Sequence, residues 1–333
     1  MHGTANIAEQ AGENLRPVRL RNLRIPLEIG IALAFLAFTL AVSNLYGLPF
    51  SLPSGERAAF VGVHYLYPLI GIAIWAAIMV FSRREEIAAT FFVALPAYAL
   101  VLLCHFNLKL WIPHLNPALW DETYWATDQA IRPAIEASMA IRTSLDPVIP
   151  LESNFYMIGF IVLFYIAFGF ACLKRPESFR ELVLAAIILQ IMGSFAYLVA
   201  PALGPFLYEA GVEPPATLAQ QSMLASWQAN VAGGGEWIAA EGGRQLTVGL
   251  AAMPSLHAGG SFLFLLYALR HARKLAIPFA LLFAFISLDA IANRWHYAID
   301  LPVGMALAAV ATWLAVRLVR RRDVSAPAKS RTA

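Results

Sequence analysis

Eight apolar stretches, each long enough to cross a lipid bilayer as an α-helix, constrain the fold of this chain more than any other feature. A single crossing needs about 20 apolar residues. The chain is 59% hydrophobic and 14% charged, with a mean hydropathy of +0.64, which is far outside the range of soluble globular proteins. We therefore expect an all-α polytopic membrane bundle. The expected spans are 25–46, 60–82, 87–106, 154–173, 179–200, 255–270, 275–292 and 297–317.

Basic residues gather at alternate ends of these spans. Most of the 24 lysines and arginines lie near the N-terminus, in the turns around residues 84, 175 and 272, and after the last span. Because cytoplasmic loops carry the excess of basic residues, both termini are predicted to be cytoplasmic. The opposite, extracytoplasmic side then holds Arg57, Lys109, Arg132, Arg142, Arg244 and Arg294.

The predicted organisation is one membrane domain with two short tails. No small-residue cleavage site follows the first apolar stretch, so we expect that span to be retained. We expect a bacterial inner membrane or a plasma membrane, with membrane lipids rather than nucleic acid as partners. The predicted parts are a cytoplasmic tail at 1–24, a catalytic membrane domain at 25–322 with its motifs within 201–304, and a cytoplasmic tail at 323–333.

Cysteine usage indicates neither a disulfide framework nor a metal site. Cys104 and Cys172 both lie inside apolar stretches, and neither belongs to a set of residues with the spacing of a metal site. We expect no metal and no other cofactor.

Two histidine clusters, at 254–259 and 296–300, are separated by a helical hairpin. The hairpin crosses the membrane and returns, so His257 and His296 should lie at the same face, which the charge pattern makes extracytoplasmic. With Asp300 four residues after His296 at the start of a helix, its carboxylate can accept from one imidazole nitrogen and free the other as a nucleophile. His257 could protonate a leaving alkoxide. The alternative is that each histidine is only an interfacial anchor.

These clusters resemble a known family. Pro-Ser-x-His at 254–257, followed by a hairpin and His-x-x-x-Asp at 296–300, is similar to the second and third motifs of the type 2 phosphatidic acid phosphatase superfamily. The residues at 253–259 and 296–300 resemble the corresponding motifs of fungal inositol phosphorylceramide synthase. The sequence His-Tyr-x-Ile-Asp at 296–300 also resembles sphingomyelin synthases. The resemblance implies that His296 attacks phosphorus, that Asp300 orients it, and that His257 acts first as an acid and later as a base.

Departures from the phosphatase pattern favour the sphingolipid branch. Phosphatases of the superfamily carry an arginine six residues before the nucleophile, where this chain has Ala290. Their first motif, a lysine followed at a distance by Arg-Pro, is not found before His257; the nearest stretch is 201–205, followed by Phe206. The sphingolipid synthases also lack the phosphatase arginine.

The resemblance implies a metal-independent lipid phosphotransferase. Such an enzyme moves a phosphoryl headgroup from a phospholipid to a lipid alcohol such as ceramide or diacylglycerol, through a phosphohistidine. A lipid phosphate phosphatase, acting on phosphatidic acid or an isoprenoid phosphate, remains the alternative enzyme. A non-catalytic transporter is the alternative of another class, because membrane histidines and acids also serve proton relays.

Candidates for binding the phosphate or the rest of the substrate lie near the clusters or in the long segments 107–153 and 201–254. The start of the helix after Met253 offers free amides for an anion. An acid at the end of an apolar helix needs a partner, and Arg294 is a plausible one for Asp289. The aromatic segment around 111–125 is an interfacial belt or a lid over a polar headgroup, and Arg244 could equally be a solvated loop charge. The candidates are Arg294, Asn293, Ser255, Arg244, Asp289, Asp121 and Asp128.

Overall fold

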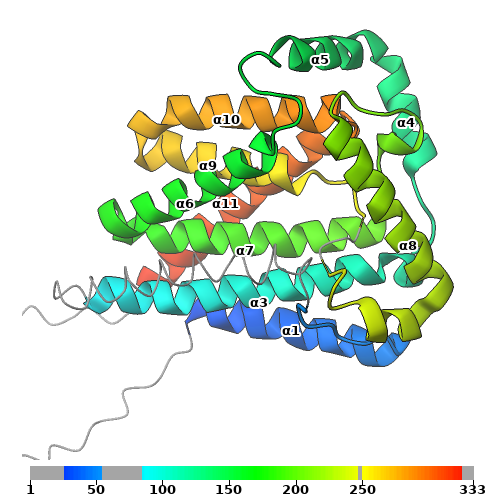
Figure 1. Ribbon diagram of the computed structural model, residues 1–333. Helices are drawn as coiled ribbons and strands as arrows, with labels where there is room; N and C mark the ends of the chain where they lie inside the picture. The colour runs from blue at the N-terminus through cyan, green and yellow to red at the C-terminus, as the bar shows by residue number, and fades with distance from the viewer. Residues whose placement is uncertain (1–25, 55–84, 247–249, 325–333) are drawn as a thin grey trace, which may run out of the picture.

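A computed structural model describes residues 26–54, 85–246 and 250–324, and this part of the chain is helical, without strands. The predicted span 60–82 and both predicted tails lie outside the described residues, apart from the start of the second tail. Figure 1 shows long helices side by side, with shorter ones across one end. The helices are α1 (Leu27–Tyr46), α3 (Glu85–Leu115), α4 (Asp121–Ala130), α5 (Arg132–Ser144), α6 (Phe155–Lys174), α7 (Pro176–Val199), η2 (Pro205–Leu207), α8 (Pro214–Glu241), α9 (Leu256–His271), α10 (Arg273–Ala292) and α11 (Asp300–Val324).

Six of the described helices are long and apolar enough to cross a membrane: α1, α3, α6, α7, α10 and α11. These helices make the chain an integral membrane protein. α9, predicted as a seventh described span, has only 16 residues. Two predicted boundaries also move, because α3 continues to Leu115 and α11 begins at Asp300 and extends through the arginines at 320–322.

The segments predicted as long loops are largely helical. α4 and α8 lie across one end of the bundle, on the right in Figure 1, and α5 lies at the top, where it packs against α10. The glycine-rich segment belongs to α8, which is kinked at Gly234 (φ +54°). Gly235 in α8, and Gly242 and Gly243 directly after it, meet residues 47–54; a Cβ on Gly243 would come 2.5 Å from Ser54 Oγ. The segment is therefore a packing surface for the loop after α1.

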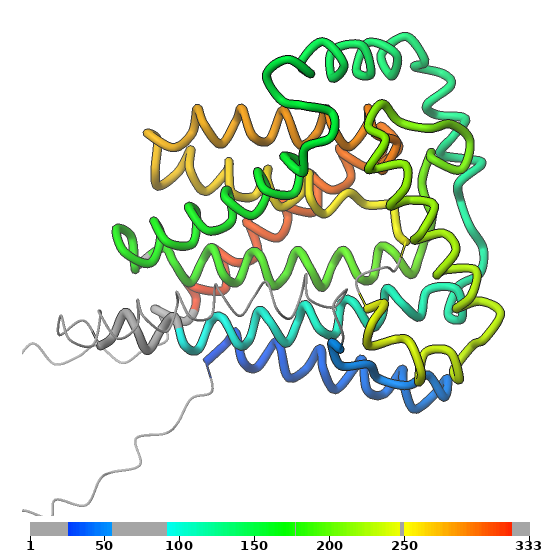
Figure 2. The backbone as a smooth tube through the Cα atoms, in the orientation of Figure 1, coloured from blue at the N-terminus to red at the C-terminus, as the bar shows by residue number. Residues whose placement is uncertain are grey.

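The chain turns at this same end before α9 and before α11, as the tube in Figure 2 makes visible. α9 begins after Ser255, whose Oγ accepts a hydrogen bond from Ala258 N at 3.3 Å and so caps the helix. The backbone N–H of Ser255 donates to the carbonyl oxygen of Asp300 at 3.1 Å. The starts of α9 and α11 are therefore joined directly, and the two histidine clusters lie together as expected.

Two glycines permit this close crossing. A Cβ on Gly259 would lie 2.7 Å from the carbonyl oxygen of Gly304, and one on Gly304 would lie 2.2 Å from the carbonyl oxygen of Ser255. Both obstacles are backbone atoms, which cannot rotate away. α9 and α11 can pack at this distance only without side chains at these positions.

We expect Gly304→Ala to destabilise the folded protein by about 1–3 kcal/mol, the usual cost of forcing extra volume into a packed contact. The matched control is Gly169→Ala in α6, where a Cβ meets nothing within 4 Å. Unfolding in detergent, followed by circular dichroism, measures both. Equal stability of the two variants would contradict the close crossing.

Candidate active site

His296 lies in the turn between α10 and α11. Its backbone N–H donates to the carbonyl oxygen of Ala290 at 3.1 Å, which ties the turn to the end of α10. The pairing with Asp300 was expected between two helical positions, but only Asp300 belongs to the helix. The imidazole is nearly buried, with 7% of the residue exposed.

The environment of the imidazole fixes its tautomer. His296 Nδ1 lies 2.8 Å from the carbonyl oxygen of Ala252 and 3.3 Å from Asp300 Oδ2. A carbonyl and an ionised carboxylate can only accept hydrogen bonds, so Nδ1 must carry the proton. In the neutral ring, Nε2 then has the free lone pair. The geometry thus prepares Nε2 to act as a nucleophile or a base.

Asp300 is held in place by the turn that precedes its helix. Its Oδ2 also accepts from Tyr297 N at 2.8 Å. The residue is fully buried, and its Oδ1 has no hydrogen-bond partner among the described residues. The carboxylate therefore has a fixed position from which it can stabilise positive charge on the imidazole.

His257 approaches the same place from the first turn of α9. Its ring packs edge-on against Tyr156 and Phe160 of α6, with ring centroids 5.3 and 4.8 Å apart. The imidazole is half-buried and lies within electrostatic reach of His296. No hydrogen bond to its ring occurs within the described ranges. The structure thus places His257 and Asp300 at the joined starts of α9 and α11, beside the turn that carries His296.

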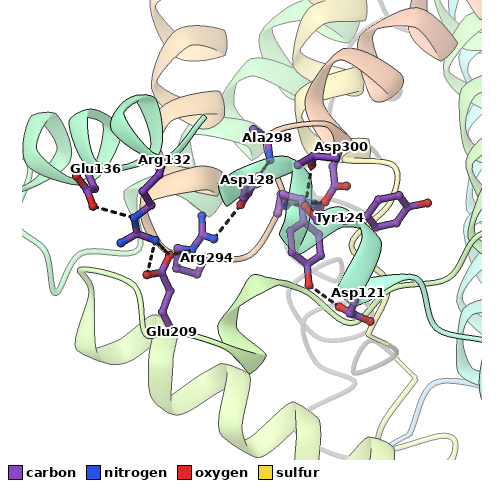
Figure 3. A network of polar contacts seen from close by, with 12 residues as sticks. Asp121, Tyr124, Asp128, Arg132, Glu136, Glu209, Arg294, Ala298 and Asp300 are labelled. Atoms are coloured by element: carbon purple, nitrogen blue, oxygen red, sulfur yellow. Dashed lines mark hydrogen bonds and ion pairs between the residues drawn. The ribbon is translucent and has the colours of Figure 1, made fainter. Parts of the chain in front are cut away.

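Asp121 and Asp128 have a different role from the one expected. Asp121 accepts from the backbone N–H groups of Leu203 and Gly204 and from the Tyr297 hydroxyl, at 2.8–3.0 Å. Asp128 accepts from Ala298 N at 2.9 Å. These buried carboxylates were predicted to accept from substrate hydroxyls. They instead fasten α4 to the loops on either side of the site, as Figure 3 shows for Asp128 and Asp121.

Arg294, the expected phosphate clamp, is enclosed by acids. Its Nη2 lies 2.8 Å from Asp128 Oδ2 and its Nε lies 2.8 Å from Glu209 Oε1, and the guanidinium stacks near Trp125. Glu209 also pairs with Arg132, which continues the network outward (Figure 3). Arg294 is fully buried and adopts φ +57°, a backbone conformation costly for a residue other than glycine. Its charge is therefore used in holding the turn before His296.

Asp289 pairs with a residue that sequence analysis did not connect to it. The suggested partner Arg294 is wrong: Asp289 Oδ1 lies 2.8 Å from Nε of the fully buried Arg142. Arg142 also pairs with Glu213, and burial raises the pKa of that carboxyl to about 7, while Arg142 opposes the rise. Asn293, expected as a phosphate donor, gives its side-chain N–H to Asp289 at 2.9 Å instead. This cluster clamps α5 to the end of α10.

The other two binding candidates also have local partners. Ser255 uses its hydroxyl oxygen as the cap of α9. Arg244 lies at the far end of α8, where its exposed guanidinium is 3.5 Å from Glu241. The solvated-charge interpretation of Arg244 therefore fits the structure, and Arg244 does not join the histidines.

Sequence reasoning missed Arg142, Glu209 and Glu213. No local signal identified them, because each contacts residues far away in the chain. Within the described ranges, no three His, Cys, Asp or Glu side chains form a group that could hold a metal ion.

Comparison with known proteins gives one match. A family model described as the PAP2 superfamily matches residues 125–314, which is more than half of the chain and contains both histidine clusters. No significant match was found among curated proteins or solved structures.

Proposed function

The chain belongs to the PAP2 superfamily, and from that membership we propose that it transfers phosphoryl groups of membrane lipids with His296 as the nucleophile. The observation that carries the proposal is the pair of acceptors on His296 Nδ1, which leaves the lone pair on Nε2. Nε2 attacks phosphorus while the bond from phosphorus to the leaving oxygen breaks. A protonated His257 gives its proton to that oxygen.

The second step reverses these roles. An acceptor hydroxyl attacks the phosphohistidine, its proton passes to His257, and the bond between phosphorus and Nε2 breaks. Asp300 stabilises the positive charge that the His296 ring gains in the first step. The two steps return the enzyme to its starting state without any other reactant.

We further propose that the acceptor is a lipid alcohol rather than water. His296 is 93% covered, and the aromatic residues of α4 and the preceding loops pack over its turn; Tyr124 lies 5.7 Å from the Tyr297 ring. Such a cover protects a phosphohistidine from water. The position of the phosphatase arginine is the fully buried Ala290. A phosphodiester carries one negative charge and needs fewer cations than a phosphate monoester, so these features favour headgroup transfer.

We place the site on the extracytoplasmic side. Lys174 ends α6, Arg270 lies in the last turn of α9 and Arg273 begins α10, all at the end of the bundle opposite the histidines. The positive-inside rule assigns that basic end to the cytoplasm.

The test uses purified protein in liposomes, with a chelator and without added metal. One reaction contains a phosphodiester lipid and an alcohol-bearing lipid, and another contains phosphatidic acid alone. We expect new lipid to form faster than phosphate is released, and neither to occur with His296→Ala. Rapid phosphate release without headgroup exchange would favour the phosphatase, and the absence of both reactions across a panel of lipids would favour a transporter.

Asp300→Asn is expected to lower kcat by at least about 10²-fold with little change in KM, because a neutral amide cannot stabilise the developing imidazolium. The carbonyl oxygen of Ala252 still accepts from Nδ1, so the ring should remain in place. Steady-state kinetics measures the effect. Wild-type kcat in this variant would exclude the proposed electrostatic role.

A further inference from the structure

Lys109 is a cation in a membrane-spanning helix, and among the described residues it has no carboxylate partner. It belongs to the apolar part of α3, near the end that lies closest to the site. Its ammonium lies over the ring of Tyr197 on α7, with Nζ 5.6 Å from the ring centroid. A lysine in such a helix is costly unless it faces a polar cavity or binds an anion.

The surface around Lys109 is polar on both helices. His105 lies one turn earlier on the same face of α3, and its Nδ1 is 2.8 Å from Ser194 Oγ on α7. The His105 ring is also 5.7 Å from the ring of Tyr197, three residues after Ser194. Two helices that are otherwise apolar therefore face each other here through hydrogen-bonding groups.

The polar contact between α3 and α7 lies close to the start of α9, which carries His257. On α7, one turn before Tyr197, a Cβ on Gly193 would come 2.6 Å from the side chain of Leu256, which directly precedes His257. The ammonium of Lys109 is within electrostatic reach of His257, and Tyr197 is within reach of Asp300. Lys109 thus approaches the candidate site between α3 and α7.

The described arginines at this end all lie beside carboxylates. Each described arginine there has at least one carboxylate partner: Arg132 pairs with Glu136 and Glu209, Arg142 with Glu213 and Asp289, Arg244 with Glu241, and Arg294 with Asp128 and Glu209. Among the described residues at this end of the bundle, Lys109 differs from the arginines because no carboxylate lies beside its ammonium. An incoming anion would find its counter-charge there.

We propose that Lys109 binds the anionic oxygens of the lipid phosphoryl group that His296 attacks, and so supplies the positive charge that Arg294 does not offer. The inference rests on the proposed function and names its missing counter-ion. Lys109 lies outside residues 125–314, so this cation comes from a helix that the family match does not include. One ammonium suits the single charge of a phosphodiester.

The experiment measures binding by titration calorimetry in detergent micelles. The probes are inorganic phosphate, a short-chain phosphatidic acid and a short-chain phosphatidylcholine. Lys109→Met removes the charge but keeps an unbranched side chain, and Lys109→Arg keeps the charge. The matched control is Lys174→Met, at the exposed end of α6. Thermal unfolding of each variant confirms that it is folded.

We expect Lys109→Met to weaken binding of all three probes by at least about tenfold, the value of a lost charge-assisted hydrogen bond. Lys109→Arg should recover part of the loss, and Lys174→Met should bind like the wild type. Weakened binding of inorganic phosphate alone would overturn the assignment to the lipid. Unchanged binding of all probes in a folded Lys109→Met would overturn it altogether.

Parallel arms separate this inference from the proposed function. His296→Ala should keep wild-type affinity for inorganic phosphate, since the anion is held by Lys109. If wild-type protein turns lipid over and Lys109→Met leaves both KM and affinity unchanged, the Lys109 site fails while the function stands. If no lipid is turned over but Lys109→Met still loses affinity for every probe, the anion site stands and the function fails.

Discussion

His296→Ala is expected to lower turnover by more than about 10²-fold, because it removes the group whose Nε2 forms the bond to phosphorus. The variant should fold normally. The turn is held by two hydrogen bonds, from His296 N–H to the carbonyl oxygen of Ala290 and from Tyr297 N–H to Asp300 Oδ2. Neither hydrogen bond needs the imidazole. Lipid turnover and the unfolding temperature are measured on the same preparation.

The control is another histidine of the same chain. His271 ends α9 at the opposite end of the bundle, 3.5 Å from Glu181. His271→Ala should keep near wild-type turnover. A His296→Ala variant retaining more than about a hundredth of the activity, in folded protein, would contradict the nucleophilic role.

Arg142→Met is expected to destabilise the protein by about 3–5 kcal/mol, because it leaves Asp289 and Glu213 buried without their counter-charge. The guanidinium is fully buried and also donates to the carbonyl oxygens of Ile149 and Pro150. Unfolding in detergent by denaturant titration measures the loss. α5 should detach from α10, which limited proteolysis within 131–150 detects.

Two variants make this result interpretable. Arg132→Met breaks the more exposed pairs with Glu136 and Glu209 and should cost at most about 1 kcal/mol. Replacing Arg142, Glu213 and Asp289 together by apolar residues should recover much of the stability, since no charge is then left unpaired. Equal losses in Arg142→Met and Arg132→Met would show that the buried cluster does not hold α5 against α10.

The helices near the histidine clusters were predictable because their signals are local. The length of each apolar stretch predicts a membrane span. The spacing of the two histidine clusters predicts a hairpin that returns to the same end of the bundle. The contact between His296 and Asp300 was also predicted, but it was expected within one helix, whereas His296 lies in the turn before α11. Asp300 reaches backward from the first residue of α11, a detail that depends on where the helix begins.

The partners of the buried charges could not be predicted. Arg142 and Asp289 are 147 residues apart in the chain, and only the docking of α5 on α10 brings them together. For the same reason Asp121 and Asp128 looked like free acceptors, although they bind backbone amides of distant loops. A sequence shows that a buried charge needs a partner, but the fold decides which partner it has.

The significance of Lys109 was hidden for the opposite reason. In the sequence it was one of several basic residues assigned to the extracytoplasmic side. Its unmatched charge stands out because the described arginines at the same end of the bundle have carboxylate partners. Whether a basic residue has a carboxylate partner depends on the fold, so the sequence did not distinguish Lys109 from the arginines.

Trapping of the covalent intermediate tests the central claim most directly. Wild-type protein is mixed briefly with a short-chain phosphodiester lipid carrying labelled phosphorus, without acceptor, then denatured at high pH and digested. We predict a base-stable, acid-labile label on His296 that is absent from His296→Ala and decays when an alcohol-bearing lipid is added. Turnover with the label on another residue, or turnover with no bound label at any time, would contradict a phosphohistidine on His296.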